Sequence, residues 1–165
     1  SSDRVVPDFV RSYLSKEPLK LRSPGSVRPW QHVLELVEGY MRLLASVSQS
    51  DPHIGHAYNF GPEAGEVTTV SELVELLTLV FPEVSVETSV SDLPEAKTLT
   101  LDSSLAKKDL NWVPFWDTAR SAQETAEWYR DSIMGANAAD LINSQLECWR
   151  NERLGNGENR VREIL

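Results

Sequence analysis

The sequence predicts an α/β fold in which several helices accompany a few short strands. Some segments, such as Val33–Val47, have apolar residues every 3.6 positions, which is the period of a helix. Between them lie short segments, such as Leu19–Arg22, in which apolar and polar residues alternate as in a strand. No internal repeat interrupts this order. The strands are too few for a complete doubly wound sheet, so the pattern also indicates a portion of a larger fold.

Composition and length indicate one soluble globular domain. The chain has 165 residues, of which 41% are hydrophobic and 25% charged, enough to build a core and too apolar for disorder. No apolar run reaches membrane-spanning length and no signal peptide is visible, so we expect a cytoplasmic protein that binds no membrane. Cys148 is the only cysteine, and the three histidines lack the spacing of a zinc site, so we expect no metal.

Charge is distributed unevenly along the chain. The net charge of −9 disfavours nucleic acid as a partner. Residues 1–28 nevertheless hold six Lys and Arg against three acidic residues. Such a local positive segment suits a small anion such as a diphosphate, although an ordinary solvated helix face would look the same.

The first 30 residues predict a helix, a strand and a turn. Apolar residues at helical spacing favour a helix over residues 4–16, in which Pro7 fits the first turn. Leu19–Arg22 alternates as a short strand does. Ser23–Ser26 has the composition of a turn.

Two further helices are expected, separated by a strand. The first covers Val33–Val47. Ala57–Phe60 is then expected to form a strand that ends before Gly61. The second helix begins near Thr69, because Glu72 lies three residues later and completes a capping box.

Shorter elements are expected in the centre of the chain. Val84–Val86 and Thr98–Leu101 alternate as strands do. A helix over Ser103–Leu110 follows. Asn111 stands where a helix C-cap needs a residue that tolerates positive φ.

The C-terminal third is expected to be helical before it becomes a polar tail. Asp117 or Thr118 can cap one helix, and Leu141–Trp149 can form another. The remaining residues are polar and rich in Gly and Asn, which predicts loose order. The expected organisation is therefore one domain over 1–149 and a tail over 150–165.

Six short motifs stand in order along residues 3–149. They are Arg4-Val5-Val6-Pro7, Glu17-Pro18-Leu19-Lys20-Leu21, Val27-Arg28-Pro29-Trp30-Gln31-His32-Val33, Tyr58-Asn59-Phe60-Gly61-Pro62, Glu95-Ala96 with Leu101-Asp102-Ser103-Ser104, and Leu110-Asn111-Trp112-Val113-Pro114. Together they resemble the extended short-chain dehydrogenases/reductases that act on nucleotide-linked sugars, and the CDP-glucose 4,6-dehydratases in particular. The resemblance implies the C-terminal, nucleotide-sugar-binding portion of a Rossmann-like fold, with a role in deoxysugar and O-antigen biosynthesis.

The resemblance also implies which residues bind substrate. Arg28 matches the family's Arg that grips the diphosphate, and a planar guanidinium suits that task. Asn59 resembles an Asn that supports the phosphate. A surface ion pair for Arg28 and a turn-stabilising role for Asn59 are the alternatives. The other expected substrate-binding residues are Arg4, Val5, Val6, Pro7, Lys20, Leu21, Arg22 and Glu95.

Two signatures that such an enzyme needs are absent from this sequence. No Gly-rich turn of the kind that seats the NAD pyrophosphate is present, and no Tyr is followed four residues later by Lys. In the intact enzyme, NAD takes hydride from sugar C4, water leaves across C5 and C6, and hydride returns to C6. We expect this chain to bind part of the substrate. It should contain no catalytic residues and should not bind NAD on its own.

Other functions remain open at this point. The chain could be the same portion of another nucleotide-sugar dehydratase or epimerase, or a free-standing module without catalysis. If it is the substrate-binding half, its partners are CDP-glucose or a related nucleotide sugar, the missing Rossmann half, and further copies in a homo-oligomer. An exposed apolar face is then expected on residues 4–14 and on the Val33–Val47 helix.

Overall fold

The computed structural model describes residues 4–48, 57–88 and 97–162. The chain divides into two compact units, Ser1–Ala126 and Glu127–Leu165, which we describe separately. Over the described residues, none of the helices combines the length and the apolar character that crossing a bilayer would require.

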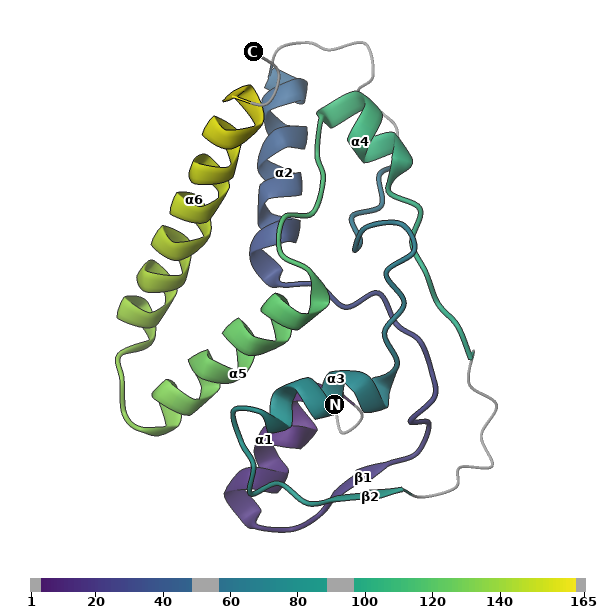
Figure 1. Cartoon of the computed structure of the whole chain (residues 1–165), viewed down its shortest axis with the longest axis vertical. Helices are drawn as coiled ribbons and strands as arrows, with labels where there is room; N and C mark the ends of the chain where they lie inside the picture. Colours follow the sequence, from purple (N-terminus) through teal and green to yellow (C-terminus); the bar gives the residue numbers. More distant parts are fainter. Residues whose placement is uncertain (1–3, 49–56, 89–96, 163–165) are drawn as a thin grey trace. The chain divides into compact units, whose positions relative to one another are not determined.

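The predicted α/β class is confirmed, with helices in the majority (Figure 1). Most predicted helices and the first strand lie where the sequence placed them. The elements are α1 (Val5–Ser15), β1 (Leu19–Leu21), α2 (Val33–Ser48), α3 (Val70–Thr78), β2 (Val86–Thr88), α4 (Ser104–Leu110), α5 (Thr118–Ile133) and α6 (Ala138–Arg162).

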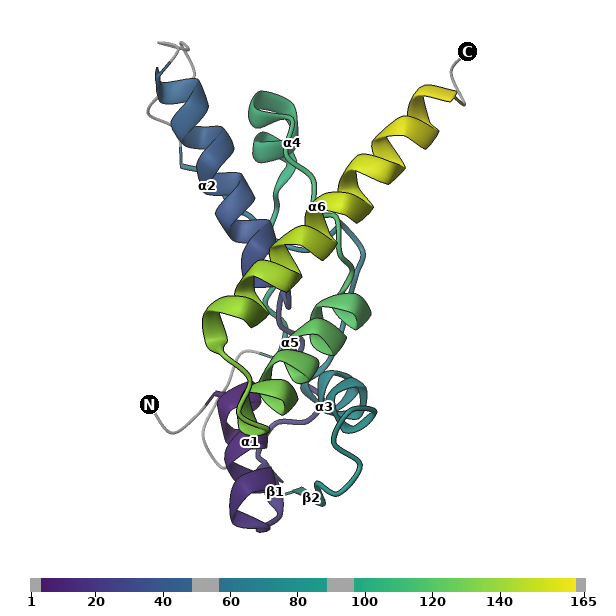
Figure 2. The same ribbon diagram turned by 90° about the vertical axis from the view of Figure 1, so that its left-hand side faces the viewer.

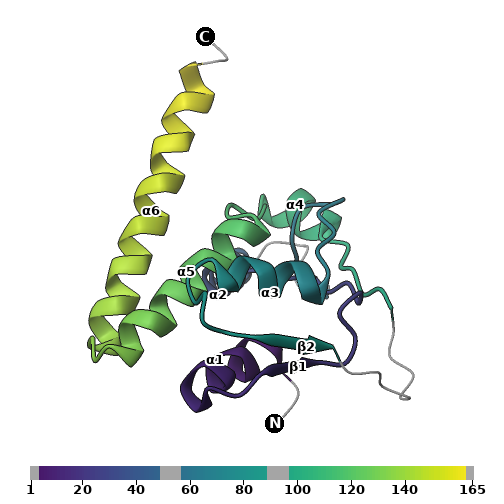
Figure 3. The ribbon, with the colours of Figure 1, turned by 60° about the horizontal axis from the view of Figure 1, so that its bottom comes forward.

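One end of the first unit is built from α1, α3 and the strand pair, which gather together in Figure 3. Strands β1 and β2 are parallel, with Leu19 opposite Val86. The ring of Phe81, just beyond α3, meets Phe9 and Tyr13 of α1 at centroid distances of 5.9 and 4.7 Å. Phe9 and Phe81 are almost fully buried, so these aromatic contacts form the core at this end.

The start of α3 also fixes the segment that follows β1. The predicted capping box is present, because Thr69 Oγ1 accepts the Glu72 N–H and Glu72 Oε2 accepts the Thr69 N–H. The N–H groups of Val70 and Ser71 then donate to carbonyl oxygens in the turn after β1, each at 2.9 Å. The turn and the residues up to Arg28 are thereby held against α3.

The other end of the first unit is built around α2 and α4. Trp112 is fully buried and contacts Phe60 edge to face, with ring centroids 5.0 Å apart. Glu35 of α2 is also fully buried, and its two carboxylate oxygens accept the N–H groups of Phe115 and Trp116 at 2.9 and 3.1 Å. A buried carboxylate needs such donors, so these bonds fix the segment between α4 and α5 against α2.

The opposite face of α2 is apolar and exposed. Met41 and Leu44 are each 61% exposed. The positions follow helical spacing, so they form one continuous stripe, which we call the α2 stripe. It agrees with the open apolar face expected for the Val33–Val47 helix, whereas on α1 only Leu14 is an exposed large hydrophobic residue. The α2 stripe consists of Val33, Val37, Tyr40, Met41, Leu44 and Val47.

Two expected strands are absent, and a third is displaced. Residues 57–60 form no strand, and the Phe60 carbonyl accepts a hydrogen bond from Gln31 Nε2 at 2.9 Å. Residues 98–101 make only an isolated bridge, between Thr98 and Val27. The strand expected at Val84–Val86 instead begins at Val86.

The second unit contains the end of α5, a turn and α6 (Figure 2). Gly135 has a φ of 95°, which permits the tight turn, and Asn137 Oδ1 accepts the Ala139 N–H at 2.8 Å to begin α6. Helix α6 continues to Arg162. The loosely ordered tail expected after residue 149 is therefore helical to that point.

Candidate functional site

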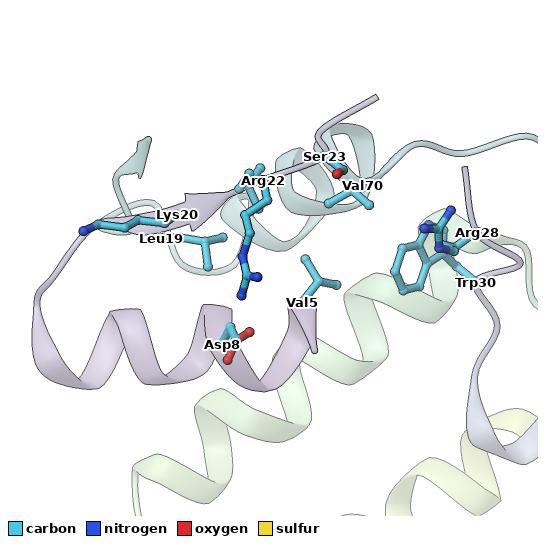
Figure 4. A pocket seen from close by; sticks show the side chains of 10 residues that line it. Val5, Asp8, Leu19, Lys20, Arg22, Ser23, Arg28, Trp30 and Val70 are labelled. Carbon is cyan, nitrogen blue, oxygen red and sulfur yellow. The ribbon is translucent and has the colours of Figure 1, made fainter. Parts of the chain in front are cut away.

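A cavity of about 200 Å³ opens where α1, β1, the turn after β1 and the start of α3 meet (Figure 4). Its walls combine aliphatic groups with three cationic side chains and one carboxylate. We call it the α1–β1 pocket. It is lined by Val5, Asp8, Leu19, Lys20, Leu21, Arg22, Ser23, Arg28, Trp30 and Val70.

Local structure explains how α1 and β1 supply their share of the lining. Val5 and Asp8 are three residues apart on α1 and therefore lie on one face of the helix. Leu19 and Leu21 are buried while Lys20 is exposed, as alternation along a strand requires. Figure 4 shows the Lys20 side chain extending away from Arg28, so Lys20 lies at the rim.

Arg28 and Trp30 form the opposite end of the pocket, where their side chains lie beside each other in Figure 4. Arg28 Nη1 donates to the Val27 carbonyl at 2.8 Å. Trp30 Nε1 donates to the Thr68 carbonyl at 3.2 Å. Both side chains are half-buried, and this hydrogen bond fixes the indole as a wall of the pocket.

The carboxylate in the pocket belongs to α1 and faces a guanidinium across the cavity. In Figure 4, Arg22 and Asp8 point toward one another, the first from the end of β1 and the second from α1. Asp8 also pairs with Arg11 and accepts the Arg4 N–H at 3.1 Å. Lys20, Arg22 and Arg28 outnumber Asp8 among the lining residues, so the pocket can hold a small anion that also carries an apolar or planar group.

The structure brings together half of the expected substrate-binding residues. Val5, Lys20, Leu21, Arg22 and Arg28, taken from three separate motifs, all line the α1–β1 pocket. Val5 and Arg28 are far apart in the sequence, so it is the fold that brings them to the same pocket.

The other expected residues do not line this pocket. Arg4 is exposed at the start of α1, and Val6 and Pro7 are half-buried elsewhere on it. Asn59 is exposed, and its Nδ2 donates to the Asp102 carbonyl at 3.3 Å, which ties its loop to the start of α4. Glu95 lies outside the described residues.

Five lining residues were not expected as ligand contacts from the sequence. Asp8 could have been found, since it lies one helical turn from Val5. Leu19 and Trp30 belong to the motifs quoted above but were not assigned to the substrate. Ser23 directly follows Arg22. No sequence pattern indicated Val70, because its position at the pocket depends on the backbone hydrogen bonds between α3 and the turn after β1.

Two other cavities are present in the described part of the first unit. One, of about 240 Å³, lies beside α4, and Lys107 and Glu63 at its edge approach to 3.6 Å. The other, of about 660 Å³, lies beside α3 and is lined by four carboxylate side chains, including those of Glu66 and Glu72. Within the described ranges no set of three potential metal ligands converges.

The described residues do not fit the pyrophosphate of NAD, the cofactor that the resemblance implies for an intact enzyme. That group is bound by a Gly-rich turn that joins a strand directly to a helix. Strand β1 is followed by Arg22 to Gly25 and then by an extended segment. We therefore assign no residue of this chain to NAD.

No family profile matches the chain, but individual proteins do. The CDP-glucose 4,6-dehydratase of Salmonella typhimurium is 32% identical over 137 residues, which are 82% of this chain and 38% of that protein. UDP-glucuronic acid decarboxylase 1 of Arabidopsis thaliana is 33% identical over 113 residues, 67% of this chain and 24% of that protein. The chain thus spans less than half the length of these relatives.

Solved structures share the fold. The UDP-glucuronic acid 4-epimerase of Bacillus cereus, in complex with UDP-glucuronic acid and NAD, superposes with a TM-score of 0.66 at 15% identity. The match covers 78% of this chain and 40% of the epimerase. The arrangement of helices around the short parallel strands is therefore one that occurs within larger proteins.

Proposed function

Because the chain is a relative of the nucleotide-sugar dehydratases and epimerases of the extended short-chain dehydrogenase/reductase family, we propose that it is the nucleotide-sugar-binding part of an NAD-dependent CDP-glucose 4,6-dehydratase. In this proposal the chain binds CDP-glucose in the α1–β1 pocket. The cofactor and the reacting groups belong to the remainder of the enzyme.

One observation carries the proposal: the α1–β1 pocket combines guanidinium groups with an apolar and aromatic lining. A nucleotide sugar needs both, because its diphosphate is anionic while its base and sugar present flat or weakly polar faces. Arg28 can offer a planar pair of N–H donors to the diphosphate. The indole of Trp30, beside it, supplies a flat apolar surface.

The α2 stripe supports the second half of the proposal. An exposed apolar stripe of this length is unusual on the surface of an independent protein. The relatives are more than twice as long as the matched segment. We therefore infer that the cofactor-binding half covers the α2 stripe, and that the chain alone shows neither dehydratase activity nor stabilisation by NAD.

A second candidate is the same part of an enzyme that acts on a UDP-sugar. The Arabidopsis decarboxylase has a similar identity to this chain, over a shorter segment than the dehydratase, and its name specifies a UDP-sugar. Comparing CDP-glucose with UDP-glucose in binding experiments separates the two candidates. We expect tighter binding of CDP-glucose.

Arg28 provides the test. We expect Arg28→Ala to weaken binding of CDP-glucose by about 1.5–3 kcal/mol, the range for hydrogen bonds to charged groups. Arg28→Lys should recover only part of that loss, because an ammonium keeps the charge without the planar fork. Titration followed by NMR detects the weak affinities expected for a half pocket, and thermal melts of all three proteins report stability.

The melts distinguish a binding residue from a structural one. A half-buried Arg at the edge of a pocket contributes little to folding, so the melting temperatures should agree closely. Unchanged affinity together with a lowered melting temperature in Arg28→Ala would make Arg28 structural. The proposed function would then lose its main support.

A further inference from the structure

We propose that Asp8 is a specificity-determining residue of the α1–β1 pocket, one that favours a diphosphate esterified at both ends over nucleotides with a terminal phosphate. This inference rests on the proposed function and adds to it a reason why the pocket would accept a nucleotide sugar and reject free nucleotides. It concerns a residue that the motifs carrying the resemblance do not include.

The geometry places a negative charge where a ligand phosphate would have to approach. Asp8 lines the same cavity as Arg22 and Arg28. In Figure 4, the Arg22 guanidinium and the Asp8 carboxylate point toward one another across the pocket. A phosphate that binds Arg22 therefore comes close to the Asp8 carboxylate and is repelled by it.

The carboxylate is held in this position from outside the pocket. Arg11, which is exposed and does not line the cavity, pairs with Asp8. The Arg4 N–H, at the start of α1, donates to the other oxygen at 3.1 Å. These two partners restrict the side chain, so it does not rotate away when an anion enters.

Charge on the ligand then decides how strongly it is repelled. A nucleotide sugar carries two negative charges on its diphosphate, because both ends are esterified. A nucleoside diphosphate carries a third and a triphosphate a fourth above about pH 7, since the terminal phosphate has a pKa near 6. Coulomb repulsion grows in proportion to charge, and at about 6 Å in water each added charge weakens binding roughly threefold.

The effect of removing Asp8 on binding should therefore increase with the charge of the ligand. A purely structural role for Asp8 would not produce this dependence. If Asp8 only positions Arg22, its removal weakens binding of all three ligands alike. If Asp8 selects by charge, its removal strengthens binding of the most highly charged ligand most. The substitution Asp8→Asn is suitable because the amide oxygen can still accept the Arg4 N–H.

The experiment titrates the full chain with CDP-glucose, CDP and CTP at low ionic strength and without magnesium, followed by NMR. We expect Asp8→Asn to lower the Kd ratio of CDP to CDP-glucose about threefold, and that of CTP to CDP-glucose about tenfold. Glu75→Gln is the charge-matched control, because Glu75 lies on α3 and does not line this pocket. It should leave both ratios unchanged.

The outcomes separate this inference from the proposed function. Equal changes for the three ligands, or weaker binding of all three, would overturn the role of Asp8 while leaving the nucleotide-sugar site intact. Failure of the wild-type chain to bind CDP-glucose or UDP-glucose at millimolar concentrations would instead overturn the proposed function, and this inference with it.

Discussion

Helices α1 and α2 both carry apolar residues at helical spacing, yet the first unit buries them in opposite ways. In α1, Phe9 is only 1% exposed and packs on Phe81. In α2, six apolar residues form the exposed α2 stripe, while Leu36 and Leu43 pack against the cluster around Trp112 and Glu35 is fully buried. The end that contains α1 closes on itself around a pocket, and the end that contains α2 leaves an apolar surface uncovered.

This difference shows what an apolar period can and cannot predict. The period predicts that a helix has one face requiring cover, but not that the covering surface is in the same chain. Helix α2 is held in the first unit by the packing of Leu36 and Leu43 against the cluster around Trp112 and by polar contacts. Its carboxylate at Glu35 accepts two backbone N–H groups, and the Glu35 carbonyl accepts Trp112 Nε1–H at 3.0 Å.

The largest expected effect comes from breaking those polar contacts. Glu35→Ala leaves the N–H groups of Phe115 and Trp116 without their carboxylate acceptor in a buried place. We expect the free energy of unfolding to fall by about 3–5 kcal/mol, as for other broken buried charged contacts. Urea denaturation measures it. Glu75→Ala, at an exposed site on α3, should cost less than about 0.5 kcal/mol, and equal losses would contradict the account.

A smaller effect concerns pH. Burial lowers the pKa of His32 from 6.5 to about 4, and its ring contacts Trp116 with centroids 5.0 Å apart. Between these two values the unfolded chain binds a proton that the folded chain does not. Stability should therefore fall as pH falls from about 6.5 toward 4, by up to about 1.4 kcal/mol per pH unit.

Denaturation at a series of pH values measures that slope, and His32→Gln should remove it. The carboxylates of Glu72 and Asp102 have pKa values below their ordinary values of 4.5 and 3.8, mainly through hydrogen bonds from Thr69 and Ser104. Their stabilising effect is lost at lower pH than that of His32. A slope between pH 6.5 and 4 that persists in His32→Gln would show that another group causes it.

The smallest expected effect on stability comes from the α2 stripe. Met41→Lys with Leu44→Lys replaces two exposed side chains, so the free energy of unfolding should change by less than about 0.5 kcal/mol. Self-association of the chain and its binding of the dye ANS should both decrease, as measured by light scattering and fluorescence. A loss of stability comparable to that of Glu35→Ala would show that the first unit itself covers the stripe.

Sequence reasoning succeeded where local chemistry determines structure. The capping box at Thr69 and the C-cap at Asn111, which has a φ of 48°, each depend on residues close in sequence. It failed at residues 57–60, whose composition is typical of a strand. The Phe60 carbonyl accepts a hydrogen bond from the side chain of Gln31, which lies far away in the sequence, and no local pattern reveals that partner.

The pocket shows the same limit. Arg28 and Arg22 were expected from motifs, and the structure places both in one cavity. Asp8 and Val70 were missed because their roles depend on how α1 and α3 meet the turn after β1. Asn59 does not line this pocket, since its Nδ2 donates to the Asp102 carbonyl near the start of α4, and its expected role at the phosphate stays a prediction.

The proposed binding of a nucleotide sugar in the α1–β1 pocket is tested most directly by mapping where CDP-glucose binds. NMR titration of the isotope-labelled chain reports every backbone amide. We expect shifts concentrated at residues 5–8, 19–23, 28–30 and 70, with little change along the α2 stripe or in α4. Shifts centred on α4 or on the α2 stripe, or none at millimolar ligand, would overturn the proposed binding site.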